Sequence, residues 1–443
     1  MLLSRRLGHA ARAVAVCVAS IPLAQCALAP TPRLPAPRLD QELPGQCVAR
    51  EVSRKPLVVE DGRLLYVEPA AFVPNHRGDV MLAGTMNMLI DLSSEGRVKG
   101  ASGDSVFGAL IRRDGRAHII PSPVPDGRLL TGIRAVARKD GGWSAVFAES
   151  KPHPREEVAP DTAVRLWHGI YDGKRWSLLE QLPLPTEGAL RPRLAATPVL
   201  RGDTLAWAMT LRVPNLANRI ALFERRGGRW TYEIIPTFHA QVQLAYSDTL
   251  GLMMAVVQPD TMVRSDGNSL ILWARKPAWR RVRRVVHGDA EGQVYTPSLT
   301  LSPTGGVLSW HAQVDDGPPR AGREARVMIG ALEERNTPVV TLDSAAVSTQ
   351  YPFAPVLLPG GGRLWVVEHA LPDMRSTEIR FVRDSAQTGV LMGRIPNPYL
   401  SQFYGATAVG PREVLVTGLQ YFANRYIVSL LLRVRVECRG DKP

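Results

Sequence analysis

The sequence predicts an all-β fold, a seven-bladed β-propeller, on three observations. A short phrase recurs in which a Gly-Gly or Gly-Asp corner precedes an apolar strand that carries a Trp or another large residue. Its clearest copies span 202–207, 305–310 and 361–365, and weaker ones begin near 78, 141, 250 and 411. The copies lie about 50–60 residues apart, and such a fixed period is typical of repeat architectures. No stretch shows a sustained helical period, and 38 Gly and 36 Pro indicate many turns.

Each repeat divides into four strands. In the copy at 294–343 we expect strands at 295–301, 307–313, 325–332 and 337–342, separated by segments rich in Gly, Pro, Asp and Ser. Four-stranded units of this kind form the blades of a propeller, which protects sheet edges by closing into a circle. Six blades with an irregular cap is the alternative count.

The two ends of the repeat region are expected to close the ring. The last unit offers strands at 406–409, 413–419 and 426–436, one fewer than the others, and 48–52 can supply the missing outer strand. Cys47 and Cys438 stand at the two ends, where a disulfide would fasten the ring. Closing so long a loop would stabilise the fold by on the order of 5 kcal/mol in the chain-entropy model.

The N-terminal region has the pattern of an export signal. Arg5, Arg6 and Arg12 form a basic region before the apolar stretch 13–24. We expect an export signal at 1–25, a Pro-rich tether at 26–46, the propeller at 47–438 and a tail at 439–443. Cys26 is a candidate for lipidation, with simple secretion as the alternative. The chain is therefore expected in a bacterial periplasm, anchored to the outer membrane, or outside the cell, as a monomer.

The chain is basic, with a formal net charge of +13. The densest cluster, at 280–284, fits either a solvated outer strand or a surface that attracts anionic polysaccharide or lipid head groups. We expect no nucleic-acid ligand, because no stacking aromatic residues accompany these charges. Motifs for metal-dependent hydrolysis, serine nucleophiles and phosphate loops are absent from the sequence, so no metal or cofactor is expected.

A ligand site is predicted at one mouth of the central channel. Antiparallel pairing places the start of each blade's first strand beside the end of its second strand, and polar or aromatic residues recur at both places. The residues expected to bind ligand there are Arg134, Arg191, Arg193, Tyr295, Tyr351, Tyr404 and His369. Arg side chains suit carboxylates and Tyr side chains suit sugars, which favours a hydroxylated or anionic ligand. A channel lined by polar residues only because it is wet is the alternative.

The segment Tyr171-Asp172-Gly173-Lys174-Arg175-Trp176 resembles the Asp-box turn of the sialidase-like propeller superfamily. The resemblance implies a blade layout and not an activity.

The leading functional hypothesis is a non-catalytic module that binds a glycan or another cell-envelope ligand. A glycoside hydrolase is the second, and it would need two carboxyl groups, for which Glu68, Glu149 and Glu368 are the candidates. An envelope scaffold that uses the blade edges is the third.

Overall fold

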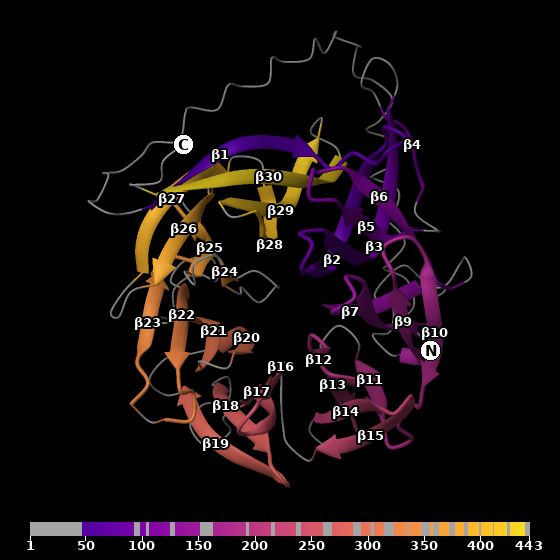
Figure 1. Ribbon diagram of the computed structural model, residues 1–443, viewed down its shortest axis with the longest axis vertical. Helices are drawn as coiled ribbons and strands as arrows, with labels where there is room; N and C mark the ends of the chain where they lie inside the picture. The colour runs from indigo at the N-terminus through magenta and orange to yellow at the C-terminus, as the bar shows by residue number, and fades with distance from the viewer. Residues whose placement is uncertain are drawn as a thin grey trace, which may run out of the picture. The chain divides into compact units, whose positions relative to one another are not determined.

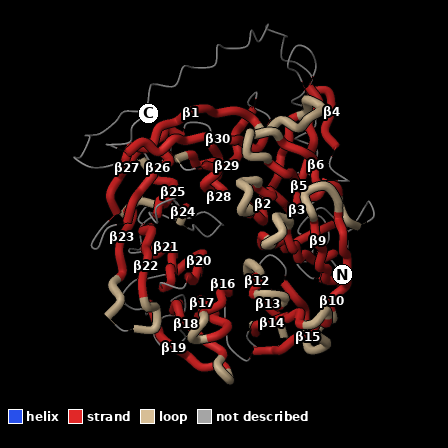
Figure 2. Tube along the Cα trace, in the orientation of Figure 1, coloured by secondary structure: helices blue, strands red, loops and turns tan. Residues whose placement is uncertain are grey.

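The computed structural model describes residues 47–438, with gaps at 93–97, 103–105, 125–128, 151–162, 192–194, 214–217, 236–240, 260–267, 287–293, 303–304, 314–322, 335, 347–354, 358–362, 372–376, 385–388, 398–399, 411 and 423–425. The described part consists of strands and loops, without a helix (Figure 2). None of its elements is therefore a helix capable of crossing a membrane. The predicted export signal, tether, tail and lipidation site at Cys26 lie outside the described residues.

The strands form seven antiparallel sheets, which are the blades of a seven-bladed propeller (Figure 1). Blade 1 comprises β2 (Leu64–Pro74), β3 (Val80–Leu92), β5 (Val106–Ile111) and β6 (Ala117–Pro121), with β4 (Val98–Ser102) paired to β3. Blade 2 comprises β7 (Leu129–Ala137), β8 (Trp143–Ser150), β9 (Ala163–Tyr171) and β10 (Trp176–Leu182). Blade 3 comprises β11 (Ala189–Arg191) and β12 (Val199–Arg201), which both pair with β13 (Thr204–Arg212), then β14 (Arg219–Arg226) and β15 (Arg229–Ile235).

The remaining four blades follow the same order along the chain. Blade 4 comprises β16 (Gln241–Ser247), β17 (Gly251–Pro259), β18 (Asn268–Arg275) and β19 (Trp279–Val286). Blade 5 comprises β20 (Val294–Ser302), β21 (Gly305–Gln313), β22 (Arg323–Gly330) and β23 (Val339–Asp343). Blade 6 comprises β24 (Val356–Leu357), β25 (Arg363–Ala370), β26 (Thr377–Asp384) and β27 (Gly389–Asn397). Blade 7 comprises β28 (Leu400–Gly410), β29 (Glu413–Phe422), β30 (Tyr426–Cys438) and β1 (Cys47–Pro56).

The N-terminal strand closes the ring, as the sequence predicted. Strand β1 pairs with β30 as the outer strand of blade 7, and Cys47 and Cys438 are Cα partners in that register. The chain then enters blade 1, and the Leu57 N–H donates to the Ser429 carbonyl at 2.7 Å. The register places the two cysteines opposite each other, while their disulfide stays a prediction.

Tryptophan side chains on the second strands fill the space between blades. Trp143, Trp207, Trp310 and Trp365 are each fully buried. Around Trp207, the core joins Val146 and Leu182 of blade 2 to Phe223 of blade 3. The recurring Trp of the sequence phrase thus packs one blade on the next, and the apolar area that it removes from water stabilises the ring.

Steric constraints explain why glycine stands at the turn before the second strand of a blade. Gly251, which starts β17, has a φ of +74°, and a Cβ there would lie 2.5 Å from the Arg275 carbonyl oxygen. Only glycine adopts this backbone conformation without strain and leaves room for the neighbouring strand. The corner therefore both turns the chain and lets the second and third strands approach.

The turn that resembles the Asp box is held together by its aspartate. The Asp172 carboxylate accepts hydrogen bonds from the Lys174 and Arg175 N–H groups, both at 2.8 Å, and these contacts lower the pKa of Asp172. Gly173 between them has a φ of +95°. The same chain reversal brings Trp176 to the start of the outer strand β10.

Candidate functional site

Strand registers define one end of the ring, which we call the mouth end, where first strands begin and second strands end. The register pairs that establish it are Leu130 with Glu149, Arg191 with Thr210, Gln241 with Val257, Tyr295 with His311, and Leu400 with Gln420. These pairs come from blades 2, 3, 4, 5 and 7. The backbone positions expected near the channel mouth therefore do lie at one end of their blades.

Buried polar side chains gather toward this end of otherwise apolar second strands. Those described are Asn87, Glu149, Thr210, His311, Glu368 and His369. In β8, for instance, Glu149 follows the buried run Val146, Phe147 and Ala148. Burying a polar group costs free energy unless partners compensate it, so this distribution is not what core packing alone would favour.

Arg134 connects two blades. Its Nε donates to the Ala195 carbonyl at 3.1 Å and its Nη1 to the Ile133 carbonyl at 2.8 Å. Part of the guanidinium therefore fixes the chain that enters blade 3. Arg191 ends β11 and is partly exposed. The expected third arginine, Arg193, lies outside the described residues, as does Tyr351.

Three further candidates are described only in their backbone. Glu68 lies within β2 opposite Met86, and not at the start of that strand, because β2 and β3 extend beyond the predicted length. Tyr295 lies near the start of β20, opposite His311, and Tyr404 lies within β28. Their roles stay predictions.

Of the three candidate carboxylates, Glu149 and Glu368 are described with their side chains. They lie in blades 2 and 6. Glu149 accepts a hydrogen bond from Trp167 Nε1 at 3.3 Å and lies 3.7 Å from Arg165 Nη1. Glu368 accepts a hydrogen bond from the Thr377 hydroxyl at 2.9 Å. Each is thus held within its own blade.

A charged cluster joins blades 5 and 6 at the mouth end, and we call it the Asp343 cluster: Asp343, His369, Glu378 and Arg380. The carboxylate of Asp343 lies 2.8 Å from His369 Nδ1 and 3.3 Å from Arg380 Nη1, and it accepts the Ala345 N–H at 2.8 Å. Arg380 Nε also donates to Glu378 at 2.7 Å. The residues of this cluster converge from β23, β25 and β26, so its geometry depends on the docking of two blades.

Electrostatics fix the protonation of this cluster. Burial alone would raise the pKa of Asp343, but the hydrogen bonds from His369 and the Ala345 N–H, with the charge of Arg380, hold it below its ordinary value. The carboxylate is therefore ionised at neutral pH and can only accept hydrogen bonds. His369 Nδ1 therefore donates the hydrogen bond to this carboxylate.

Nearby, His311 is 2% exposed and adjoins the same boundary. Burial lowers its pKa from 6.5 to about 4, with a further contribution from the charge of Arg323. His311 is therefore neutral at pH 7.

Among the described residues, no group of His, Cys, Asp or Glu is arranged to hold a metal ion.

Sequence reasoning identified His369 but not the other three members of the Asp343 cluster. The only local signal was Asp343 itself, an acidic residue that ends the apolar strand β23. The arginine cluster at 280–284 lies in β19, the outer strand of blade 4. An outer strand was one of the two interpretations of this cluster.

Comparison with known proteins gives similarity in structure only. No family model matches the chain, and no curated protein matches it. Similar solved structures include a protein of unknown function from Dyadobacter fermentans, at 10% identity, with 89% of this chain and 100% of that chain covered and a TM-score of 0.45. Another is an α-L-arabinofuranosidase from Fusarium graminearum with an iminosugar inhibitor, at 12% identity, 69% and 93% coverage and a TM-score of 0.45.

A third is the Trypanosoma rangeli sialidase in complex with the inhibitor DANA, at 12% identity, 86% and 59% coverage and a TM-score of 0.42. At these identities no residue role is carried over from any of the three.

Proposed function

We propose that this protein is an exported β-propeller that binds a glycan at the mouth end of its ring. The observation that carries the proposal is the set of polar side chains buried toward the ends of the second strands in blades 1, 2, 3, 5 and 6. Most of these side chains have partners within the protein, but the Thr210 hydroxyl and the Asn87 amide oxygen have none among the described residues, and such a group costs on the order of 1–3 kcal/mol. Their gathering at one end is what a hydrogen-bonding ligand site requires.

His369 offers the clearest contact for a sugar hydroxyl. Its Nδ1 is occupied by Asp343, and its Nε2 forms no hydrogen bond with the residues that the structure describes. An imidazole nitrogen that a buried carboxylate holds in one orientation can meet a sugar hydroxyl without being reoriented on binding. Arg191, partly exposed at the end of β11, adds a charged donor at the same end of the ring.

Binding is favoured over glycoside hydrolysis by the environment of the carboxylates. Hydrolysis by the usual route needs two carboxyl groups about 5–9 Å apart, one on either side of the glycosidic bond. Glu149 and Glu368 belong to blades 2 and 6, and each already accepts hydrogen bonds from its own blade. The carboxylates of Asp343 and Glu378 do approach each other, but Arg380 binds both of them. We therefore assign the mouth end to binding.

A glycan array, run alongside hydrolysis of fluorogenic glycosides, tests the proposal. The informative variants are Arg191→Ala with Arg193→Ala, and His369→Ala. The matched control is Arg280→Ala with Arg281→Ala, which removes two exposed arginines from the outer strand β19. We expect about tenfold weaker glycan binding in the mouth variants, since a hydrogen bond to a charged group is worth about 1.5–3 kcal/mol, and unchanged binding in the control.

Equal losses in the mouth and control variants would mean non-specific attraction by net charge. Unchanged binding in every variant would exclude the mouth end as the site. Hydrolysis that is lost in Glu149→Gln or Glu368→Gln would establish the enzyme in place of the binding module.

A further inference from the structure

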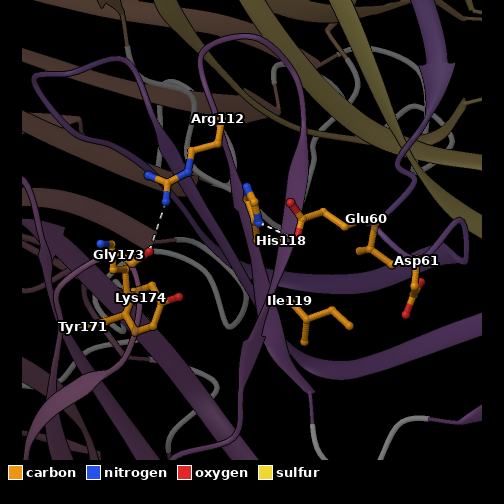
Figure 3. A pocket seen from close by; sticks show the side chains of 9 residues that line it. Glu60, Asp61, Arg112, His118, Ile119, Tyr171, Gly173 and Lys174 are labelled. Atoms are coloured by element: carbon orange, nitrogen blue, oxygen red, sulfur yellow. Dashed lines mark hydrogen bonds and ion pairs between the residues drawn. The ribbon is translucent and has the colours of Figure 1, made fainter.

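A hollow lies at the end of the blades opposite the mouth end, between the outer hairpins of blades 1 and 2 (Figure 3). It has a volume of about 530 Å³ and is lined by residues of the segment after β1, of the β5–β6 hairpin and of the β9–β10 turn. That volume lies within the range of small-molecule sites. The hollow shares no residue with the mouth end, so its function is a separate question.

The two walls of the hollow carry opposite charge. Arg112 and Lys174 stand on one side, while Glu60 and Asp61 belong to the segment that enters blade 1 (Figure 3). Arg112 is fixed in place, because its Nη1 lies 2.9 Å from Asp79 Oδ2 and its Nη2 donates to the Gly173 carbonyl at 3.2 Å. The Lys174 ammonium forms no ion pair with the residues that the structure describes.

Tyr171 supplies the observation that points to a ligand. Its side chain is almost completely buried, at 2% exposure, yet its hydroxyl forms no hydrogen bond with any described residue. The hydroxyl points into the space between Arg112, His118 and Ile119 (Figure 3). Burial raises the pKa of Tyr171, so the hydroxyl keeps its proton and is a donor at neutral pH. Because Tyr171 lines the hollow and its hydroxyl has no partner among the described residues, this donor is available to a ligand bound there.

We propose that this hollow binds a small acidic sugar. The carboxylate of the ligand would accept hydrogen bonds from Tyr171 and Arg112 beside the charge of Lys174, and its hydroxyl groups would donate to Glu60. The Asp61 carboxylate is already held by the Arg63 guanidinium. The Glu60 carboxylate, which lies 2.9 Å from His118 Nδ1, is 63% exposed and keeps capacity to accept further hydrogen bonds. A neutral sugar would satisfy only the acidic wall, and a simple inorganic anion only the basic one.

Indole N–H resonances of the two nearest tryptophans report on this hollow directly. The ring centroids of Trp143 and Trp176 lie 6.4 and 5.3 Å from that of Tyr171, and both indole groups are held by carbonyl oxygens. The full-length protein, labelled with ¹⁵N-tryptophan, is titrated with D-glucuronate and, separately, with D-glucose and with inorganic phosphate. Trp310 and Trp365, buried in blades 5 and 6, serve as internal references.

We expect saturable shifts of Trp143 and Trp176 with glucuronate, and binding at least about tenfold weaker with glucose or phosphate. Tyr171→Phe removes only the hydroxyl and keeps the packed ring, and it should weaken glucuronate binding about tenfold, as should Lys174→Gln. Arg175→Gln is the matched control, because that side chain lies in the same turn and is 84% exposed. It should leave the affinity unchanged.

The absence of a saturable shift with glucuronate would overturn the proposal. So would equal affinities for glucuronate and glucose, unchanged binding in Tyr171→Phe, or shifts confined to Trp310 and Trp365. Stronger binding of phosphate than of glucuronate would also overturn it, since it would assign the basic wall to inorganic anions.

Discussion

The buried histidine of blade 5 makes the stability of this fold depend on pH in a defined window. His311 has a pKa of about 4 in the folded protein, against 6.5 ordinarily, because burial and the neighbouring Arg323 disfavour its charged form. The unfolded chain therefore binds a proton that the folded chain does not. Stability then falls as the pH drops from about 6.5 to about 4, and the contribution levels off below that.

The size of the effect follows from the difference between the two pKa values. A fall from 6.5 to about 4 corresponds to about 3 kcal/mol of unfolding free energy over the whole window. Burial also lowers the pKa of His168, which contributes in the same direction. Carboxylates held below their ordinary pKa, such as Asp343, act only at lower pH, since their stabilisation is lost as the pH falls below about 4.

Urea unfolding of the wild type and of His311→Gln, at several pH values between about 7 and 4.5, measures this contribution. The variant should lose about 2 kcal/mol of the pH dependence in that range, whatever its stability at pH 7. His76→Gln, which changes an exposed histidine, is the control and should follow the wild type. An unchanged pH dependence in His311→Gln would refute the inference that this group is buried uncharged.

Three further predictions concern the architecture. Trp207→Ala should cost about 3–5 kcal/mol and lower the urea midpoint without changing the slope, because the fully buried indole joins two blades. Gly251→Ala should cost more than about 1 kcal/mol, measured in the same way, because its φ is +74° and the added Cβ would lie 2.5 Å from the Arg275 carbonyl oxygen. Non-reducing peptide mapping should find Cys47 linked to Cys438, and Cys47→Ser should lower the melting temperature only if that link is found.

Most of the fold could be predicted because its signals are local. The glycine corners, the strand lengths and the Asp172 turn all depend on residues close together in the chain, whose backbone preferences are known. The period of the phrase gave the number of blades, and one missing strand indicated that the N-terminus completes blade 7. Pairing of β1 with β30 confirms that inference.

The candidate sites could be predicted only in part. Alignment on the corners placed His369 at the end of its strand, because strand direction alone decides that position. It could not find Asp343, because this residue of blade 5 meets His369 and Arg380 only when blade 6 docks against blade 5. The hollow at Tyr171 was missed for the same reason, as Arg112 and Glu60 reach it from two other segments.

The sequence by itself determined the repeat, the all-β class and the closure of the ring, because hydrogen bonding within and between neighbouring strands follows from local residue chemistry. Only the tertiary structure decided which charges meet across a blade boundary and which polar groups line a hollow between two blades. Those outcomes depend on side-chain directions and on the docking of whole blades, and short-range preferences carry no information about either.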